Sequence, residues 1–252
     1  MLAQLPTPIL FAHRGSSAYA PENTLAAFKL AVEQGAEAIE LDAKLCADRQ
    51  VVVIHDQTVD RTTGSTGKVR ELSLAALREL DAGSYFGPAF HGEKIPTLAE
   101  VFDTVGQSIY INVELTNYAS PTDELPDLVA GLVERFGMQD RVLFSSFNPL
   151  ALIRIHRHLP QALLGLLALP GRSGAFARSG IGRWVVTYQA LHPEKGDVTP
   201  GLVERVHRVG KRVHVWTVNE AQTIRDLVSW KVDGIITDDP ILAQKVIQNE
   251  VG

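Results

Sequence analysis

The feature that most constrains the fold of this chain is the alternation of short apolar, β-branched runs with helical stretches of roughly a dozen residues. Two of these helices have clear ends, since 24–34 stops before Gly35 and 200–209 stops before Gly210. Such alternation is typical of repeated βα units around a parallel sheet. We expect strands at 9–13, 38–43, 51–55, 110–115, 141–145, 162–167, 184–188, 212–217 and 234–237.

The number of expected strands favours a closed barrel. If 51–55 continues the second strand after a hairpin-like detour at 47–50, eight strands remain, as in a (β/α)8 TIM-type barrel. Residues 57–96 do not follow the alternation of strands and helices, because they are rich in turn formers and contain one short helical piece at 73–80. We therefore expect one α/β catalytic domain over 1–252, with a small insertion at about 57–96 folded over the barrel mouth.

Composition narrows the class of protein. The net charge of −5 argues against nucleic-acid or anionic-membrane partners, which require a broad positive field. A single cysteine, Cys46, excludes an intramolecular disulfide and a cysteine-based metal cluster. There is no long apolar run and no leader-like N-terminal segment, so we expect a cytoplasmic protein without stable membrane insertion. The sequence does not address the oligomeric state.

Carboxylates recur at the ends of two expected strands. Glu40 and Asp42 share one strand face, and two such charges repel unless a cation neutralises them. For an isolated Glu-x-Asp, the common alternative is solvation or pairing with Lys44. Here Asn112 and Glu114 also lie two residues apart on the next strand. Three carboxylates from adjacent strands predict a site for Mg²⁺ or Ca²⁺ rather than zinc.

Two histidines accompany these carboxylates. His13 ends the first expected strand and His55 ends the run after the second. One histidine at a strand end is usually a structural hydrogen-bonding residue, but two at one barrel rim fit a general acid and a general base. The planar guanidinium of Arg14 suits a phosphate, and an ion pair with Glu22 is the alternative interpretation. Together these residues indicate phosphodiester cleavage.

An ordered set of motifs runs along nearly the whole chain. The motifs are His13-Arg14-Gly15, Pro21-Glu22-Asn23-Thr24, Glu40-x-Asp42, His55-Asp56 with Arg61-Thr62-Thr63-Gly64, Ile95-Pro96-Thr97-Leu98, Ser145-Ser146-Phe147 and Trp216-Thr217-Val218-Asn219. Any one of these motifs is weak, whereas the ordered set is highly specific. In this order the motifs resemble the glycerophosphodiester phosphodiesterase family, in its cytosolic bacterial type.

The resemblance implies a TIM-type barrel that hydrolyses glycerophosphodiesters to sn-glycerol 3-phosphate and an alcohol. It implies one divalent cation, Mg²⁺ or Ca²⁺, held by Glu40, Asp42 and Glu114. It also implies His13 and His55 as the acid–base pair and a course through a cyclic phosphate that water opens. Arg14, Trp216 and Phe147 are the candidate substrate-binding residues, although an aromatic residue at such a position is as often part of the core.

One position departs from the family pattern. Members commonly have a lysine two residues after the third-strand glutamate, where this chain has Thr116. The loss of a cation beside a phosphate leaves open a weak or degenerate barrel that binds phosphorylated polyols. A lysophospholipase D-like phosphodiesterase is a further alternative, because head-group selection depends on loops. We expect Thr116→Lys to preserve activity or to tighten substrate binding.

Other polar residues are assigned to structural roles. His91, His156, His158, His192 and His207 follow no metal-ligand spacing and are expected on the surface or in loops. His214 is interpreted as an inward polar residue of the barrel, and Asp238-Asp239-Pro240 as the cap of the last helix.

Overall fold

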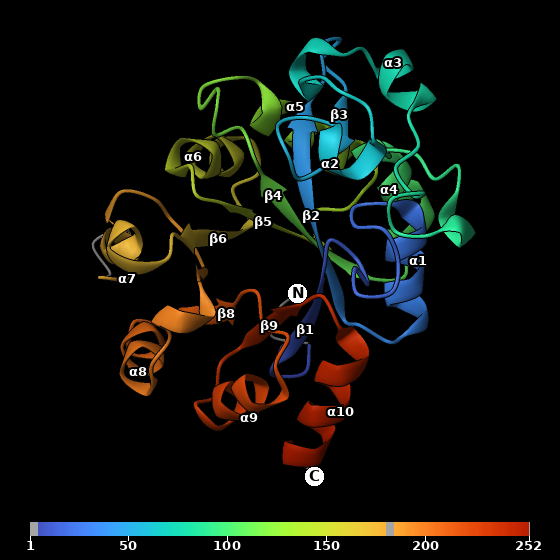
Figure 1. The fold of residues 1–252 in the computed structure, drawn as a ribbon. Coiled ribbons are helices and arrows are strands. Elements are labelled where there is room, and N and C mark those ends of the chain that lie inside the picture. Colours follow the sequence, from blue (N-terminus) through green and yellow to red (C-terminus); the bar gives the residue numbers. More distant parts are fainter. Residues whose placement is uncertain (1–4, 180–183, 252) are drawn as a thin grey trace.

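Eight parallel strands close into a barrel in the computed structural model, which describes residues 5–179 and 184–251. Each strand pairs with its neighbours in the order given below, and the last strand pairs with the first (Figure 1). The expected (β/α)8 barrel is therefore confirmed. The strands are β1 (Ile9–His13), β2 (Ala38–Leu45), β4 (Tyr110–Leu115), β5 (Val142–Ser146), β6 (Leu163–Ala168), β7 (Ala190–Pro193), β8 (Arg212–Val215) and β9 (Gly234–Thr237).

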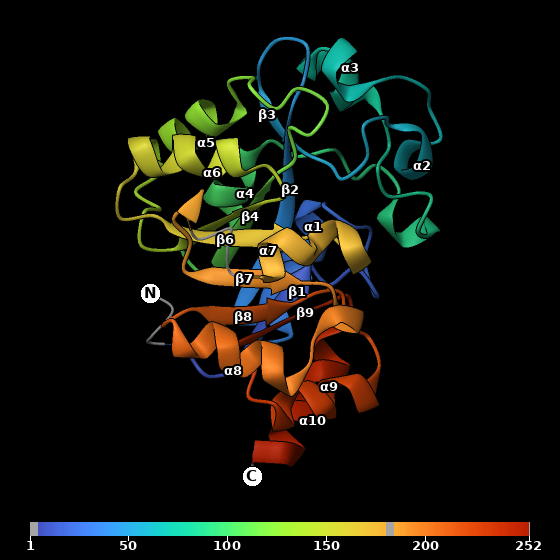
Figure 2. The ribbon, with the colours of Figure 1, turned by 90° about the vertical axis from the view of Figure 1, so that its left-hand side faces the viewer.

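Helices cover the outside of the strands, as Figures 1 and 2 both show. Their starts follow local capping rules: the Thr24 side chain accepts a hydrogen bond from Ala27 N, and Thr97 forms a capping box with Glu100. These helices are α1 (Leu25–Glu33), α4 (Leu98–Val105), α5 (Leu125–Arg135), α6 (Pro149–His158), α7 (Ala175–Arg178), α8 (Pro200–Arg208), α9 (Ala221–Ser229) and α10 (Pro240–Val251). None of the helices in the described ranges is long and apolar enough to cross a membrane.

Two strand expectations need correction. The strand expected at 184–188 is wrong, because β7 begins at Ala190. Val186 and Tyr188 are buried apolar contacts, so this run has the composition of a strand without its pairing. The run after the second strand forms β3 (Val51–Val53), which pairs antiparallel to β2 and does not continue it. The count of eight parallel strands holds without β3.

The segment between β3 and α4 packs on β3 and on the turn before it through a small apolar cluster. The helix expected at 73–80 is present as α3 (Leu74–Glu79), and α2 (Asp60–Thr63) and the 3-10 turns Val69–Glu71 and Pro88–Phe90 were not foreseen. The Tyr85 hydroxyl accepts a hydrogen bond from the backbone N–H of Glu22, which ties this segment to the chain that follows β1. The cluster contains Cys46, Val52, Ile54, Val59, Val69, Leu77, Ala82 and Ile95.

The barrel interior contains a buried pair of histidines. His192 of β7 and His214 of β8 are both fully buried, with 3.1 Å between His214 Nδ1 and His192 Nε2. The surface role expected for His192 is therefore wrong, whereas His214 lies inside the barrel and packs on the ring of Phe11. A Cβ at Gly165 would come within 2.4 Å of His192 Nε2, and a Cβ at Gly234 within 2.8 Å of His214 Cδ2. Both glycines are thus needed to make room for the imidazoles.

Candidate active site

Three carboxylates meet where β2 and β4 run side by side. Asp42 and Glu114 are paired in register, and Glu40 lies two residues before Asp42 on the same strand face. Ligand oxygens of Glu40, Asp42 and Glu114 all lie within 4.8 Å of one another. Glu40 and Asp42 are almost completely buried. The structure therefore brings together the three carboxylates that the sequence singles out.

The electrostatics of this cluster are asymmetric. Burial, together with repulsion from Asp42 and Glu114, raises the pKa of Glu40 well above its ordinary value. Burial and the charge of Asp42 raise the pKa of Glu114 to about 8. Burial would also raise the pKa of Asp42, but the charges of Arg14 and His55 and a hydrogen bond from Asn23 outweigh it and lower that pKa. The negative charge of the three carboxylates thus exceeds the positive charge of the neighbouring cations.

This donor set fits a hard divalent cation. All three ligand groups are carboxylates, which Mg²⁺ and Ca²⁺ prefer, and none is the sulfur or nitrogen typical of zinc sites. The positive groups beside the cluster do not balance its three carboxylates, and the pKa values of Glu40 and Glu114 are raised. Glu40, Asp42 and Glu114 are therefore suited to bind such an ion.

Arg14 contacts two of the three carboxylates of the cluster. Its backbone has a positive φ of 56°, a conformation that non-glycine residues rarely adopt. In this conformation its N–H donates to Glu40 Oε2 at 3.1 Å, and its Nη1 donates to Glu22 Oε1 at 2.9 Å. Its Nε lies 3.4 Å from Asp42 Oδ2. Arg14 therefore forms the ion pair with Glu22 and also lies at the carboxylate site.

His13 and His55 each have a carboxylate against one ring nitrogen. His13 Nδ1 lies 2.6 Å from Asp238 Oδ1, and His55 Nδ1 lies 2.7 Å from Asp56 Oδ1. A hydrogen bond from Arg61, foremost, lowers the pKa of Asp56 to about 2. Burial would raise the pKa of Asp238, but its hydrogen bond with His13 contributes to lowering it to about 2. Two ionised carboxylates therefore orient the two imidazoles.

The eight residues expected to act in catalysis, metal binding or substrate binding all line one pocket of about 100 Å³. Its polar side is formed by the histidines, Arg14 and the carboxylates, and its apolar side includes Phe147 and Trp216, whose ring centroids are 5.7 Å apart. The lining residues are His13, Arg14, Glu40, Asp42, His55, Asn112, Glu114, Phe147, Leu167, Trp216, Thr217 and Ile236.

Two residues of the site were not predicted from the sequence. Asp238 was expected only as part of a helix cap, but Asp239 accepts the capping hydrogen bond from Leu242 N and Asp238 contacts His13 instead. Tyr118 donates from its hydroxyl to Glu114 Oε1 at 2.7 Å and accepts from Phe147 N at 3.3 Å. Only the Asp-Asp pair before Pro240 drew attention to Asp238, and nothing local pointed to Tyr118.

Lys44 contacts Thr116, the residue found where the family pattern has its lysine. Lys44 Nζ donates to Thr116 Oγ1 at 2.8 Å, and Thr116 Oγ1 donates to Ala43 O at 2.7 Å. Both side chains are buried, and burial lowers the pKa of Lys44 although the charges of Asp42 and Glu114 act to raise it. The neighbouring strand therefore brings a lysine next to residue 116.

Comparisons with known proteins agree with this geometry. Residues 13–242 match the model of the Glycerophosphoryl diester phosphodiesterase family. The glycerophosphodiester phosphodiesterase of Caldanaerobacter subterraneus subsp. tengcongensis is 38% identical over 92% of this chain and 94% of its own length. The enzyme of that name from Bacillus altitudinis is 34% identical over 94% and 97%.

A solved structure shows the same fold. It is that of an Oleispira antarctica phosphodiesterase in complex with the product sn-glycerol-3-phosphate, and it is 30% identical to this chain. The two align with a TM-score of 0.87 over 96% of this chain and 97% of that one.

Proposed function

The chain belongs to the glycerophosphoryl diester phosphodiesterase family, and from this premise we propose that its pocket hydrolyses glycerophosphodiesters to sn-glycerol 3-phosphate and an alcohol. The observation that carries the proposal is the meeting of two carboxylate-backed histidines with a three-carboxylate cluster in one pocket. We propose that the reaction depends on a divalent cation and takes place in the cytoplasm.

His13 and His55 divide the proton transfers in this proposal. One imidazole takes the proton from a glycerol hydroxyl, whose oxygen then forms a bond to phosphorus. The bond between phosphorus and the alcohol oxygen breaks, and the other imidazole donates a proton to that oxygen. Water then opens the resulting cyclic phosphate with the two roles reversed. Asp238 and Asp56 keep each ring oriented through its Nδ1.

The remaining residues bind and orient the phosphate. Glu40, Asp42 and Glu114 would hold one Mg²⁺ or Ca²⁺, which supplies positive charge next to the phosphate oxygens when bound. Arg14 provides a guanidinium at the same pocket, and the Lys44 ammonium offsets the carboxylate charge from behind. The position of Lys44 next to Thr116 favours the catalytic proposal over a degenerate, non-catalytic barrel, because that alternative rested on Thr116.

The test is the release of sn-glycerol 3-phosphate from glycerophosphocholine and glycerophosphoethanolamine by the purified protein. We expect release that stops with EDTA and returns when Mg²⁺ or Ca²⁺ is restored. Release unaffected by EDTA would contradict the metal dependence. No release from either substrate with either ion would contradict the proposed reaction.

A further inference from the structure

Two of the three carboxylates in the cluster have one oxygen bound to a donor from the chain that follows β1. The Arg14 N–H donates to Glu40 Oε2 at 3.1 Å, and Asn23 Nδ2 donates to Asp42 Oδ2 at 2.8 Å. Both carboxylates are almost completely buried, so these bonds fix the orientation of each carboxylate group. Among the described residues, no hydrogen bond reaches the second oxygen of either group. Glu40 and Asp42 therefore each offer one oxygen to a cation.

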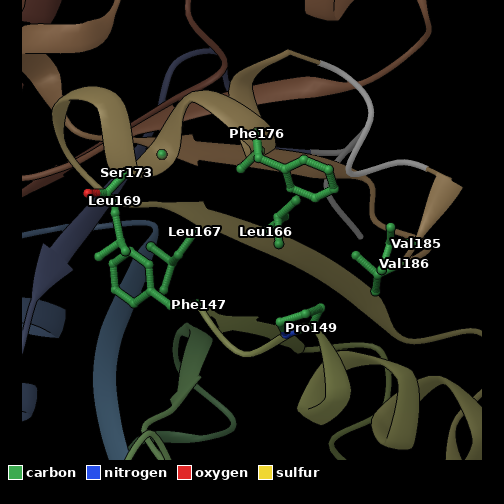
Figure 3. Close-up of a pocket in the computed structure, with 11 residues that line it drawn as sticks. Phe147, Pro149, Leu166, Leu167, Leu169, Ser173, Phe176, Val185 and Val186 are labelled. Atoms are coloured by element: carbon green, nitrogen blue, oxygen red, sulfur yellow. The ribbon is translucent and has the colours of Figure 1, made fainter.

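The third carboxylate is held by Tyr118. The Tyr118 hydroxyl accepts a hydrogen bond from Phe147 N at 3.3 Å, so its single proton is directed to Glu114 Oε1, 2.7 Å away. The rings of Tyr118 and Phe147 pack edge to face, with 5.6 Å between their centroids. Phe147 is itself held by its neighbours, since Figure 3 shows its ring next to Leu167 at the edge of an apolar pocket. Tyr118 thus leaves Glu114, like the other two carboxylates, with one oxygen for a cation.

Three carboxylates that each offer a single oxygen suit Mg²⁺ better than Ca²⁺. Mg²⁺ demands an octahedron of oxygens and usually keeps several waters, so one oxygen from each carboxylate leaves positions for water and for the phosphate. Ca²⁺ takes about six to eight oxygens and often receives two of them from one carboxylate. A carboxylate with one oxygen turned toward a protein donor is poorly placed to supply both. The donors around the cluster therefore bear on the choice between the two ions.

We propose that Tyr118 is a positioning residue that limits Glu114 to one ligand oxygen, and that the carboxylate cluster consequently selects Mg²⁺ over Ca²⁺. This inference rests on the part of the proposed function that places a divalent cation on Glu40, Asp42 and Glu114. Tyr118 acts through Glu114 and is not itself a ligand. It lies in the loop after β4, outside the motifs that resemble the family.

Calorimetric titration of the metal-free protein with Mg²⁺ and with Ca²⁺ tests the selection independently of turnover. We expect the parent protein to bind Mg²⁺ more tightly than Ca²⁺. Tyr118→Phe removes the hydroxyl and frees both oxygens of Glu114, so we expect the affinity for Mg²⁺ to fall by about tenfold and the affinity for Ca²⁺ to stay unchanged or to rise. Equal affinity for the two ions in the parent, or tighter binding of Ca²⁺, would overturn the inference.

Tyr19→Phe is the matched control. Tyr19 is 40% exposed and Tyr118 is 38% exposed, and each hydroxyl donates to a carboxylate, which for Tyr19 is Asp239. Both affinities in Tyr19→Phe should equal those of the parent. A general loss of structure in Tyr118→Phe would weaken both ions alike, so an equal loss for Mg²⁺ and Ca²⁺ would overturn the positioning role. The same change of selectivity in Tyr19→Phe would overturn its assignment to Tyr118.

Hydrolysis of glycerophosphocholine separates this inference from the proposed function. The Mg²⁺ concentration that gives half-maximal hydrolysis should rise by about tenfold in Tyr118→Phe. Cation-dependent hydrolysis combined with equal or tighter binding of Ca²⁺ overturns the inference and leaves the proposed function in place. Selective binding of Mg²⁺ without hydrolysis supports the inference and contradicts the proposed function. Hydrolysis without binding of either ion overturns the inference and the metal dependence, and leaves the reaction itself in place.

Discussion

Four histidines of the barrel form two pairs, one that lines the pocket and one that is buried in the barrel interior. His13 and His55 reach the pocket with side chains 17% and 43% exposed, and each has a carboxylate against Nδ1. His192 and His214 are fully buried, face each other and have no carboxylate partner among the described residues. Burial lowers the pKa of His192 to about 3, and burial first, then His192, lowers that of His214 well below its ordinary value.

This difference shows what allows an imidazole to act in proton transfer. A buried pair without a counter-charge is held neutral and has no access to substrate, so it can only pack and hydrogen-bond. An imidazole that opens into a pocket and is oriented by a carboxylate can exchange a proton with a bound molecule. The surroundings, and not the residue type, separate the proposed catalytic pair from the structural pair.

The largest effect is expected from removal of the pocket histidines. His13→Ala and His55→Ala should each lower kcat by about 10²–10⁴-fold, because each removes a proton-transfer group. Circular dichroism and metal titration should show an intact fold and little change in metal affinity. His192→Leu is the control from the buried pair, and its kcat should stay close to that of the parent protein. A comparable loss of kcat in His192→Leu would contradict the distinction between the catalytic and the structural histidines.

Removal of the charge that orients His13 should have a smaller effect. Asp238→Asn keeps the shape of the side chain but removes the carboxylate against His13 Nδ1, and we expect kcat to fall by about 10–100-fold. The adjacent Asp239→Asn is a matched control, because Asp239 contacts Tyr19 and the start of α10. Equal kcat in the two variants would remove Asp238 from the proposed mechanism.

Substitutions at the Lys44–Thr116 contact should have a smaller effect on activity than those at Asp238. From sequence alone, Thr116→Lys is expected to preserve activity or to tighten substrate binding. The structure predicts a loss of activity instead, because two ammonium groups would meet in a buried space. Lys44→Met should weaken substrate binding by about tenfold through loss of a nearby cation. The exchange Lys44→Thr with Thr116→Lys should restore activity relative to either single variant. An exchange variant no better than Thr116→Lys alone would contradict this role for Lys44.

The smallest effect is on stability and comes from the buried pair. The pKa of His192 is lowered in the folded state, so the unfolded chain binds more protons as the pH falls below about 6.5, and stability falls with it. Between pH 7 and pH 5.5 we expect a loss of about 1 kcal/mol from His192. Urea unfolding at the two pH values should show a smaller loss in His192→Leu. An identical loss in this variant and the parent would show that His192 is not held neutral.

Much of the fold could be predicted because its determinants are local. The caps Thr24, Thr97 and Thr199 and the apolar runs of the barrel strands act within a few residues of themselves. The strand expected at 184–188 failed because apolar residues that pack without pairing have the same composition as a strand.

The three carboxylates expected to bind the metal could also be predicted, whereas the carboxylate that orients His13 could not. Glu40, Asp42 and Glu114 follow from strand alternation and from the order of neighbouring strands. Asp238 lies 225 residues from His13 along the chain, and the pairing of β9 with β1 brings the two together, so spacing in the sequence gives no sign of this contact. Lys44 and Thr116 follow the same alternation on β2 and β4 as the carboxylates, but the sequence does not show that the Lys44 ammonium contacts the Thr116 hydroxyl. His192 was misassigned for the same reason, since its burial depends on Gly165 of the neighbouring strand.

The most direct test of the acid and base roles uses a leaving group that needs no proton. The measurement compares kcat/KM for glycerophosphocholine and for the p-nitrophenyl ester of glycerol 3-phosphate in the parent, His13→Ala, His55→Ala and His192→Leu proteins. The account predicts that one of the two pocket variants regains most of its lost activity on the nitrophenyl ester, while the other stays impaired on both substrates. His192→Leu should match the parent on both. Equal losses of His13→Ala and His55→Ala on both substrates would contradict the division of acid and base between these two histidines.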